Sequence, residues 1–194
     1  MILANDKLLR GEREILLAQE PLVGFKSIYL EPFAKADQHA VDEIMYADIV
    51  VFGPGGLYTS LIPNLLVDGV GKALRETKAK KVFVANLMSK KRQTPGFTLT
   101  NYLEEIERFI GKDVFDHIII NNRLPPSRLL ELYSEEAEVI ENDLGMSSRI
   151  ITADLIDDEE ADYAKSDLIA HTRALIRHHP QKLAAELMKI VNHL

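Results

Sequence analysis

The chain has 194 residues, of which 46% are hydrophobic and 27% are charged, so it can bury a sizeable core. Its formal net charge of −7 gives no general attraction for nucleic acid or anionic membranes, whose binding proteins carry basic patches. The absence of cysteine excludes disulfides, thiolate metal ligands and cysteine nucleophiles. The sequence has neither an apolar run near the roughly 20 residues that span a bilayer nor a signal peptide. We therefore expect a soluble, cytoplasmic protein without nucleic-acid or membrane partners.

The first half of the chain predicts strands that alternate with helices. β-branched and aromatic residues predict a strand over 23–30, and apolar spacing predicts a helix over 37–45. The continuous apolar run over 48–52 is typical of a strand that is buried on both faces. Apolar residues recur at helical spacing over 67–78, and a further buried strand is predicted over 81–87.

The alternation continues in the second half. Thr98 is a candidate N-cap for a helix that stops at Gly111, and Pro180 suits the first turn of a final helix, with His179 at its cap. The other predicted elements are strands at 114–120, 139–140 and 149–156, a short helix at 127–133 and an acidic loop at 157–162. Strand–helix alternation implies crossover connections, and therefore an α/β fold with a mainly parallel sheet covered on both faces. With no linker or repeat, we expect a single domain over 1–194.

Three loops follow predicted strands and could carry a ligand site. In open parallel sheets, ligands bind outside the carboxyl ends of the strands, where the chain order reverses. The loops at that edge are 53–64, 88–96 and 121–126. A site for a small ligand is therefore expected in one or more of them.

The loop after the strand over 48–52 has the composition of an anion cradle. Gly53, Gly55 and Gly56 permit positive φ angles and let backbone N–H groups face a ligand. Thr59 and Ser60 lie where a helix would begin, a position at which hydroxyls cap helices and phosphates bind. A tight turn in which the glycines only reverse the chain explains the same residues equally well.

The second loop is polar after an apolar strand. Asn86 could contact a base, ribose or phosphate, although asparagine more often satisfies loop backbone, and Met88 more often packs in a core. The basic run 90–92 could form a local anion site but is more commonly a solvated loop. The histidines lack His-x-x-x-His spacing, and no Gly-x-Ser-x-Gly elbow occurs, so neither a metal site nor a serine hydrolase is supported.

Three stretches carry a family resemblance: ADIVVFGPGGLYTSLIPNLLVDGVGKAL, KAKKVFVANLMSKKRQTPGFTLTNYLEEI and RHHPQKLAAELMKI. Together they resemble the 2-phospho-L-lactate transferase/gluconeogenesis-factor family (CofD and YvcK type), chiefly its C-terminal half. The resemblance implies a Rossmann-like, three-layer α/β fold that binds nucleotide-type ligands. Carried over by motif, the implied ligand-binding residues are Gly53, Gly55, Gly56, Tyr58, Thr59, Ser60, Asn64, Asn86, Met88, Thr94 and Gly96.

The chain also departs from the family pattern. Gly56 stands where the family usually has serine, and basic residues at 90–92 stand where it has acidic ones. The family's Asp-His pair in the next helix is Asn101-Tyr102, and the aspartate before the last helix is His179. Since carboxylates hold hard cations, these differences argue against metal-assisted catalysis, and no metal ligand is predicted. The family's Gly-Gly-Gly-Thr-Gly loop and N-terminal strands have no counterpart in the sequence.

The resemblance yields three functional hypotheses. The first is a gluconeogenesis-factor-like regulator of cell shape and carbon metabolism that binds a nucleotide or sugar nucleotide. The second is an enzyme that transfers a phospholactyl group with Mg²⁺, and the third is a degenerate lobe that binds no nucleotide. Because a partial sheet exposes apolar edges, we also expect a homo-oligomer or a partner that supplies the missing N-terminal half.

Overall fold

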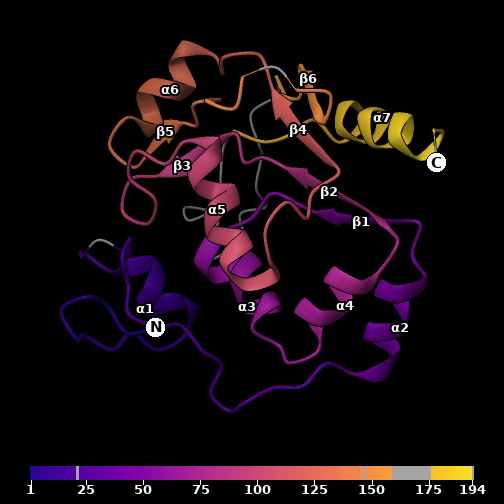
Figure 1. Cartoon of the computed structure of the whole chain (residues 1–194). Helices are drawn as coiled ribbons and strands as arrows, with labels where there is room; N and C mark the ends of the chain where they lie inside the picture. Colours follow the sequence, from indigo (N-terminus) through magenta and orange to yellow (C-terminus); the bar gives the residue numbers. More distant parts are fainter. Residues whose placement is uncertain (21, 146, 159–175, 194) are drawn as a thin grey trace, which may run out of the picture.

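The computed structural model describes residues 1–20, 22–145, 147–158 and 176–193 (Figure 1). Strands and helices alternate along most of this length, as the sequence predicts. The elements, in chain order, are α1 (Gly11–Leu17), α2 (Gln38–Tyr46), β1 (Ile49–Phe52), the π-helix η1 (Leu57–Leu61), α3 (Ile62–Leu65), α4 (Val70–Glu76), β2 (Lys80–Val84), β3 (Met88–Lys90), α5 (Leu99–Ile110), β4 (His117–Asn121), α6 (Ser127–Tyr133), β5 (Ala137–Val139), β6 (Ile150–Ala153) and α7 (Pro180–Val191).

The main sheet in this part of the chain has four strands in the order β1-β2-β4-β6. All three pairings are parallel, with Val51 opposite Val82, Phe83 opposite Ile118 and Ile119 opposite Ile151. Short strands β3 and β5 form a separate antiparallel pair. The chain order rises steadily across the main sheet and does not reverse within it.

Helices cover both faces of the main sheet. On one face, Phe83, Ala85, Ile118 and Ile120 join a core that includes Leu65 of α3, Leu74 of α4 and Leu103 and Ile106 of α5. On the other face, Val82, Val84 and Ile119 pack with Leu155 and with Ile190 of α7. Figure 1 shows the same division, with α3, α4 and α5 on the side of the sheet away from α7. The α/β, three-layer fold predicted from the sequence is confirmed.

The predicted strand over 23–30 is wrong. Its only pairing among the described residues is an isolated bridge between Ser27 and Ile2, where Ile2 donates its backbone N–H to the Ser27 carbonyl at 2.7 Å. Phe25 of this segment is buried in the larger core and Ile28 packs against it, whereas Val23 and Tyr29 are exposed. The composition of the segment is typical of a strand, but a strand also needs a neighbouring strand, and none in the described part pairs with it beyond this bridge.

Strand β1 lies where the sequence predicts a strand, over 48–52, but it is not buried on both faces as predicted. Phe52 is buried, whereas Val51 is 41% exposed. The reason is its place at the edge of the sheet, since within the described residues β1 has β2 as its neighbour on one side alone. An apolar run therefore occurs here without the double cover that such runs usually indicate.

The predicted helix boundaries are close to the observed ones. Thr98 caps α5 in a capping box with Asn101, and Gly111 ends the helix with a φ of 100°. The ring of His179 accepts the backbone N–H of Lys182 at the start of α7. Of the predicted acidic loop over 157–162, residues 159–162 lie outside the described part. No helix in the described part is both long and apolar enough to cross a bilayer.

Candidate functional site

The loops after β1, β2 and β4 all lie at the carboxyl edge of the parallel sheet, the usual position of ligand sites. The loop after β1 runs through Gly53–Gly56 into η1, a single turn of π-helix. The Gly56 carbonyl accepts the N–H groups of both Ser60 (2.7 Å) and Leu61 (3.1 Å), which widens this turn. Single π-turns occur frequently at functional sites.

Asn86 holds the glycine loop in place. Its side chain accepts the N–H of Gly55 at 3.0 Å and donates to the Gly55 carbonyl at 2.9 Å. Two predicted site residues that are 31 positions apart in sequence are therefore brought together. Both hydrogen-bonding groups of Gly55 and the Asn86 amide are occupied by this pair, so Asn86 supports the loop, and the Gly55 N–H does not face open space.

The glycines serve a different purpose from the predicted one. None of Gly53, Gly55 and Gly56 has a positive φ angle. A Cβ at Gly56 would lie 2.3 Å from Thr59 Oγ1, and one at Gly55 would lie 3.2 Å from Ser60 Cβ. The absence of side chains at 55 and 56 therefore makes room for Thr59 and Ser60, which fold back over the loop.

Thr59 and Ser60 present the polar groups of this loop. Ser60 is exposed and Thr59 is partly buried, and neither hydroxyl has a hydrogen-bond partner within the described residues. Asn64, one helical turn later, donates its amide to the Ser60 carbonyl at 2.6 Å and so fixes the backbone beneath them. Two hydroxyls on a rigid turn are therefore available to an incoming anion.

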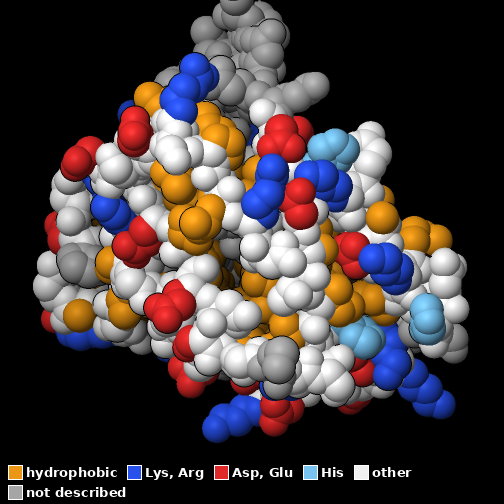
Figure 2. Space-filling model, turned by 90° about the horizontal axis from the view of Figure 1, so that it is seen from above, with side chains coloured by type: hydrophobic (Ala, Val, Ile, Leu, Met, Phe, Trp, Pro, Cys, Tyr) orange, Lys and Arg blue, Asp and Glu red, His pale blue; other side chains and the backbone are white. Residues whose placement is uncertain are grey.

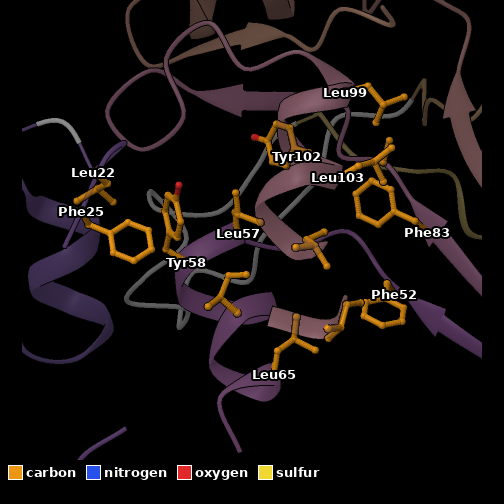
Figure 3. Close-up of a cluster of buried hydrophobic side chains, with 14 of the residues drawn as sticks. Leu22, Phe25, Phe52, Leu57, Tyr58, Leu65, Phe83, Leu99, Tyr102 and Leu103 are labelled. Carbon is orange, nitrogen blue, oxygen red and sulfur yellow. The ribbon is translucent and has the colours of Figure 1, made fainter. Parts of the chain in front are cut away.

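Tyr58, the neighbour of Thr59, points the other way. Figure 3 shows its ring among Leu22, Phe25 and Leu57, and it is only 1% exposed. The rings of Tyr58 and Phe25 meet edge to face at 5.4 Å. Burial, reinforced by the nearby carboxylate of Glu105, raises the pKa of Tyr58 far above its usual value. The structure places Tyr58 in the core, where it anchors η1 and does not line an open surface.

The predicted residues of the second loop are also engaged within the protein. The Thr94 hydroxyl is buried and lies 2.9 Å from the Tyr102 hydroxyl, and burial raises the pKa of Tyr102 to about 12. Gly96 adopts a φ of 65° and donates its N–H to Glu138 at 2.5 Å. Met88 belongs to β3 and packs against a small buried cluster. These contacts order the loop and explain why its composition is unusual without a ligand.

The basic run is divided between structural and exposed positions. Lys91 donates to the Ser134 carbonyl at 2.5 Å, which ties the β3 turn to α6. Lys90 and Arg92 are exposed and form no ion pair with any described residue. The run is thus partly a solvated loop, as its composition suggested.

The third loop is ordered by an ion-pair network. Arg123 lies 2.9 Å from Asp154 and 2.7 Å from Asp158, and Lys182 of α7 lies 2.8 Å from Asp154. Asn121 accepts the N–H of Leu155 at 3.1 Å. The network connects the ends of β4 and β6 with the start of α7. The polar side chains of this loop therefore stabilise the packing of α7 on the sheet.

His178 is a polar residue at the carboxyl edge that motif inspection did not select as a site residue. Burial lowers the pKa of His178, and the backbone of Ala85, the residue before Asn86, partly opposes this shift. Its Nε2 is buried without a partner in the described part of the chain. The adjacent His-His-Pro sequence was the available signal, but nothing in its spacing connected it with β2.

The cavities do not enlarge the candidate site. At the carboxyl ends of β2 and β4, a cavity of about 20 Å³ is lined by residues that include Asn86, Asn121 and Asn142, which leaves room for little more than one water. A cavity of about 530 Å³ lies at the opposite end, beside Arg75, Lys81 and Asp116. Neither of these two cavities is lined by a residue of the loop 53–60.

The face of the molecule seen from above carries charges of both signs (Figure 2). Figure 2 shows lysine and arginine side chains interspersed with aspartate and glutamate over the face seen from above. Among the described residues, no three histidine, aspartate or glutamate side chains gather closely enough to hold a metal ion.

The parallel sheet, its helices on two faces and the loop at the carboxyl end of β1 define a Rossmann-like α/β protein. A family model described as "2-phospho-L-lactate transferase CofD" matches residues 1–159. The chain therefore belongs to the CofD family.

Curated relatives within this family carry a narrower name. The chain is 33% identical over 191 residues to a "Putative gluconeogenesis factor" of Aquifex aeolicus, a match that covers 97% of this chain and 56% of the relative. It is 31% identical over 174 residues to the "Gluconeogenesis factor" of Listeria monocytogenes, covering 88% of this chain and 51% of that protein. The chain thus spans about half the length of these relatives.

A solved structure has the same fold. The crystal structure of a UPF0052-family protein from Bacillus halodurans superimposes with a TM-score of 0.77 at 26% identity. The match covers 96% of this chain and 56% of the solved chain.

Proposed function

We propose that the chain acts as a gluconeogenesis-factor-type regulator that binds a nucleotide or sugar nucleotide at the loop after β1. The observation that carries the proposal is the pair of unpartnered hydroxyls, Thr59 and Ser60, on a turn that Asn86 and Asn64 hold rigid. Hydroxyls and backbone N–H groups at the start of a helix suit phosphate oxygens. From the family resemblance we further propose that the regulator acts in the cytoplasm, on cell shape and carbon metabolism.

A phospholactyl transferase is the second candidate, favoured by the description of the matching family model. Such transfer would use Mg²⁺, which requires oxygen ligands and prefers carboxylates beside the substrate phosphates. The described residues offer no cluster of carboxylates for it. The names of the relatives also favour the regulator.

The test is isothermal titration calorimetry of the chain with UDP-glucose, UDP and GDP, each with and without Mg²⁺. We expect heat from at least one of these without metal. Replacing both Thr59 and Ser60 with alanine should weaken that binding by about a hundredfold or more, since each hydrogen bond to a charged group contributes about 1.5–3 kcal/mol.

Ser134→Ala is the matched control, because it also removes the hydroxyl of an exposed residue but lies at the end of α6 and not in the loop after β1. The Ser134→Ala variant should bind the nucleotide with the same affinity as the unaltered chain. If binding appears only with Mg²⁺, the transferase is favoured instead. If a folded chain gives no heat with any probe, the degenerate lobe is favoured and the cradle has no ligand of this class.

A further inference from the structure

The cavity of about 530 Å³ lies at the amino-terminal edge of the parallel sheet, at the opposite end from the glycine loop. Helices α4 and α5 end there and strands β2 and β4 begin there, and the lining consists of Leu74, Arg75, Lys81 and residues 110–116. Its volume is within the range of about 300–1,000 Å³ that is usual for sites of small molecules. A ligand in this cavity would not contact the cradle.

The cavity has an excess of positive charge. The charged residues of its lining are three cations and two carboxylates, namely Arg75, Lys81, Lys112, Asp113 and Asp116. Both carboxylates are paired with cations from outside the lining, since Lys80 lies 3.0 Å from Asp116 and Arg149 lies 3.4 Å from Asp113. The three cations of the lining are therefore not neutralised by its carboxylates, in a chain whose net charge is −7.

Arg75 is held against the wall of the cavity by two glycines. Its Cδ lies 3.4 Å from the position that a Cβ of Gly111 would take, and its Nη1 lies 3.4 Å from that of a Cβ of Gly71. The absence of these two side chains lets Arg75 cross from α4 to the end of α5. Its guanidinium nevertheless forms no hydrogen bond or ion pair with any described residue. A positioned, permanently charged fork is therefore available to a ligand.

The two lysines add further donors. The ammonium of Lys81 donates to the carbonyls of Ala79 at 3.0 Å and Thr77 at 3.4 Å. Since an ammonium group has three N–H donors, one remains. Lys112 is exposed and, like Arg75, has no hydrogen bond or ion pair within the described part of the chain. Arginine binds phosphate through a fork of two hydrogen bonds and lysine binds it as a point charge.

We propose that this cavity is a second ligand site, which binds the phosphate group of a small molecule between Arg75, Lys81 and Lys112. A phosphate group carries about −1.5 to −2 charges at pH 7, which suits a site with three cations. Cations at the carboxyl end of a helix also stabilise the helix through its dipole. That role alone requires no cavity and predicts no binding of phosphate, so an experiment can separate the two.

The experiment titrates the isotopically labelled chain with pyrophosphate, and separately with inorganic phosphate, at a constant ionic strength set by sodium chloride. Two-dimensional amide NMR spectra report which residues respond. We expect saturable shifts of the amide signals of Arg75, Lys81 and residues 111–114. The amides over 53–60 report any binding at the cradle separately.

Arg75→Gln should weaken the binding of pyrophosphate by at least about tenfold, since a hydrogen bond to a charged group contributes that much or more. Lys112→Gln should weaken it by about threefold, because an exposed charge contributes less. Arg75→Lys keeps the charge without the fork and should retain part of the affinity. Thermal unfolding of each free variant shows that it is folded.

Lys72→Gln is the matched control. Lys72 is also an exposed cation of α4, but its Nζ lies 3.9 Å from Glu76 and it does not line the cavity. The control removes the same charge from the same helix, so it should leave the affinity for pyrophosphate unchanged.

The proposal is overturned if neither probe shifts the amides over 111–114, or if the shifts are confined to 53–60. It is likewise overturned if folded Arg75→Gln binds pyrophosphate no more weakly than Lys72→Gln, since the anion would then respond only to overall charge. Tighter binding of citrate than of pyrophosphate to the same amides would assign the site to carboxylates and contradict the phosphate. None of these readouts involves a nucleotide, so they remain separate from failure of the cradle.

Discussion

Asn86 shows how a single side chain can define a loop. Its amide pairs with both backbone groups of Gly55, and the pair is partly buried. An amide is the one uncharged side-chain group that both donates and accepts in this geometry. Asparagine was predicted here as a ligand contact or as a support for loop backbone, and the structure shows the second role.

Replacing Asn86 with alanine should lower the free energy of unfolding by about 1–3 kcal/mol, because it leaves the Gly55 N–H and C=O without partners. Urea denaturation followed by circular dichroism measures this. Asn122→Ala is the control, because that side chain is exposed and forms no hydrogen bond with a described residue. It should change stability by less than about 0.5 kcal/mol. Equal effects of the two substitutions would show that the Asn86–Gly55 pair does not stabilise the loop.

At the scale of elements, the glycine loop and η1 depend on close packing rather than on unusual backbone angles. Gly56 has a φ of −60° and a ψ of 123°, which any residue can adopt. A glycine is required at position 56 because the side chain of Thr59 occupies the space that a Cβ would fill. The sequence located the turn correctly, but the reason for the glycine depends on how the following helix folds back.

Gly56→Ala should therefore destabilise the chain by about 1–3 kcal/mol through overpacking. Gly53→Ala should have a much smaller effect, because a Cβ there meets no atom within 4 Å and φ is not positive. Adding Thr59→Ala to Gly56→Ala should restore part of the loss, as a double-mutant cycle in urea would reveal. A cycle with zero coupling would contradict the contact.

At the scale of the whole molecule, α7 completes the three layers. It comes from the end of the chain, yet its Leu183, Leu187 and Ile190 cover Val82 and Ile119 in the middle of the sheet. Without it, that face of the parallel sheet would be open to water, whereas parallel sheets are almost always covered on both faces. The ion pairs of Lys182 with Asp154 fix where the helix begins.

Ile190→Ala should lower the free energy of unfolding by about 2–5 kcal/mol, a large part of the 5–15 kcal/mol typical of a domain. Met188→Ala on the same helix is the control, because Met188 is 52% exposed and should cost far less. Both are measured by urea denaturation. A small loss for Ile190→Ala would show that α7 packs only loosely on the sheet.

The sequence by itself determined the order and type of most elements, the caps of α5 and α7 and the position of the glycine turn. These features depend on residues that are close in the chain, through hydrophobic periodicity, capping and chain-breaking residues. Only the tertiary structure decided that 23–30 forms no strand, that Tyr58 and Thr94 are buried and that Asn86 binds Gly55. It also decided that β1 is an edge strand among the described residues. Most of these features depend on partners tens of residues away, and local sequence patterns carry no information about which distant segment a residue will meet.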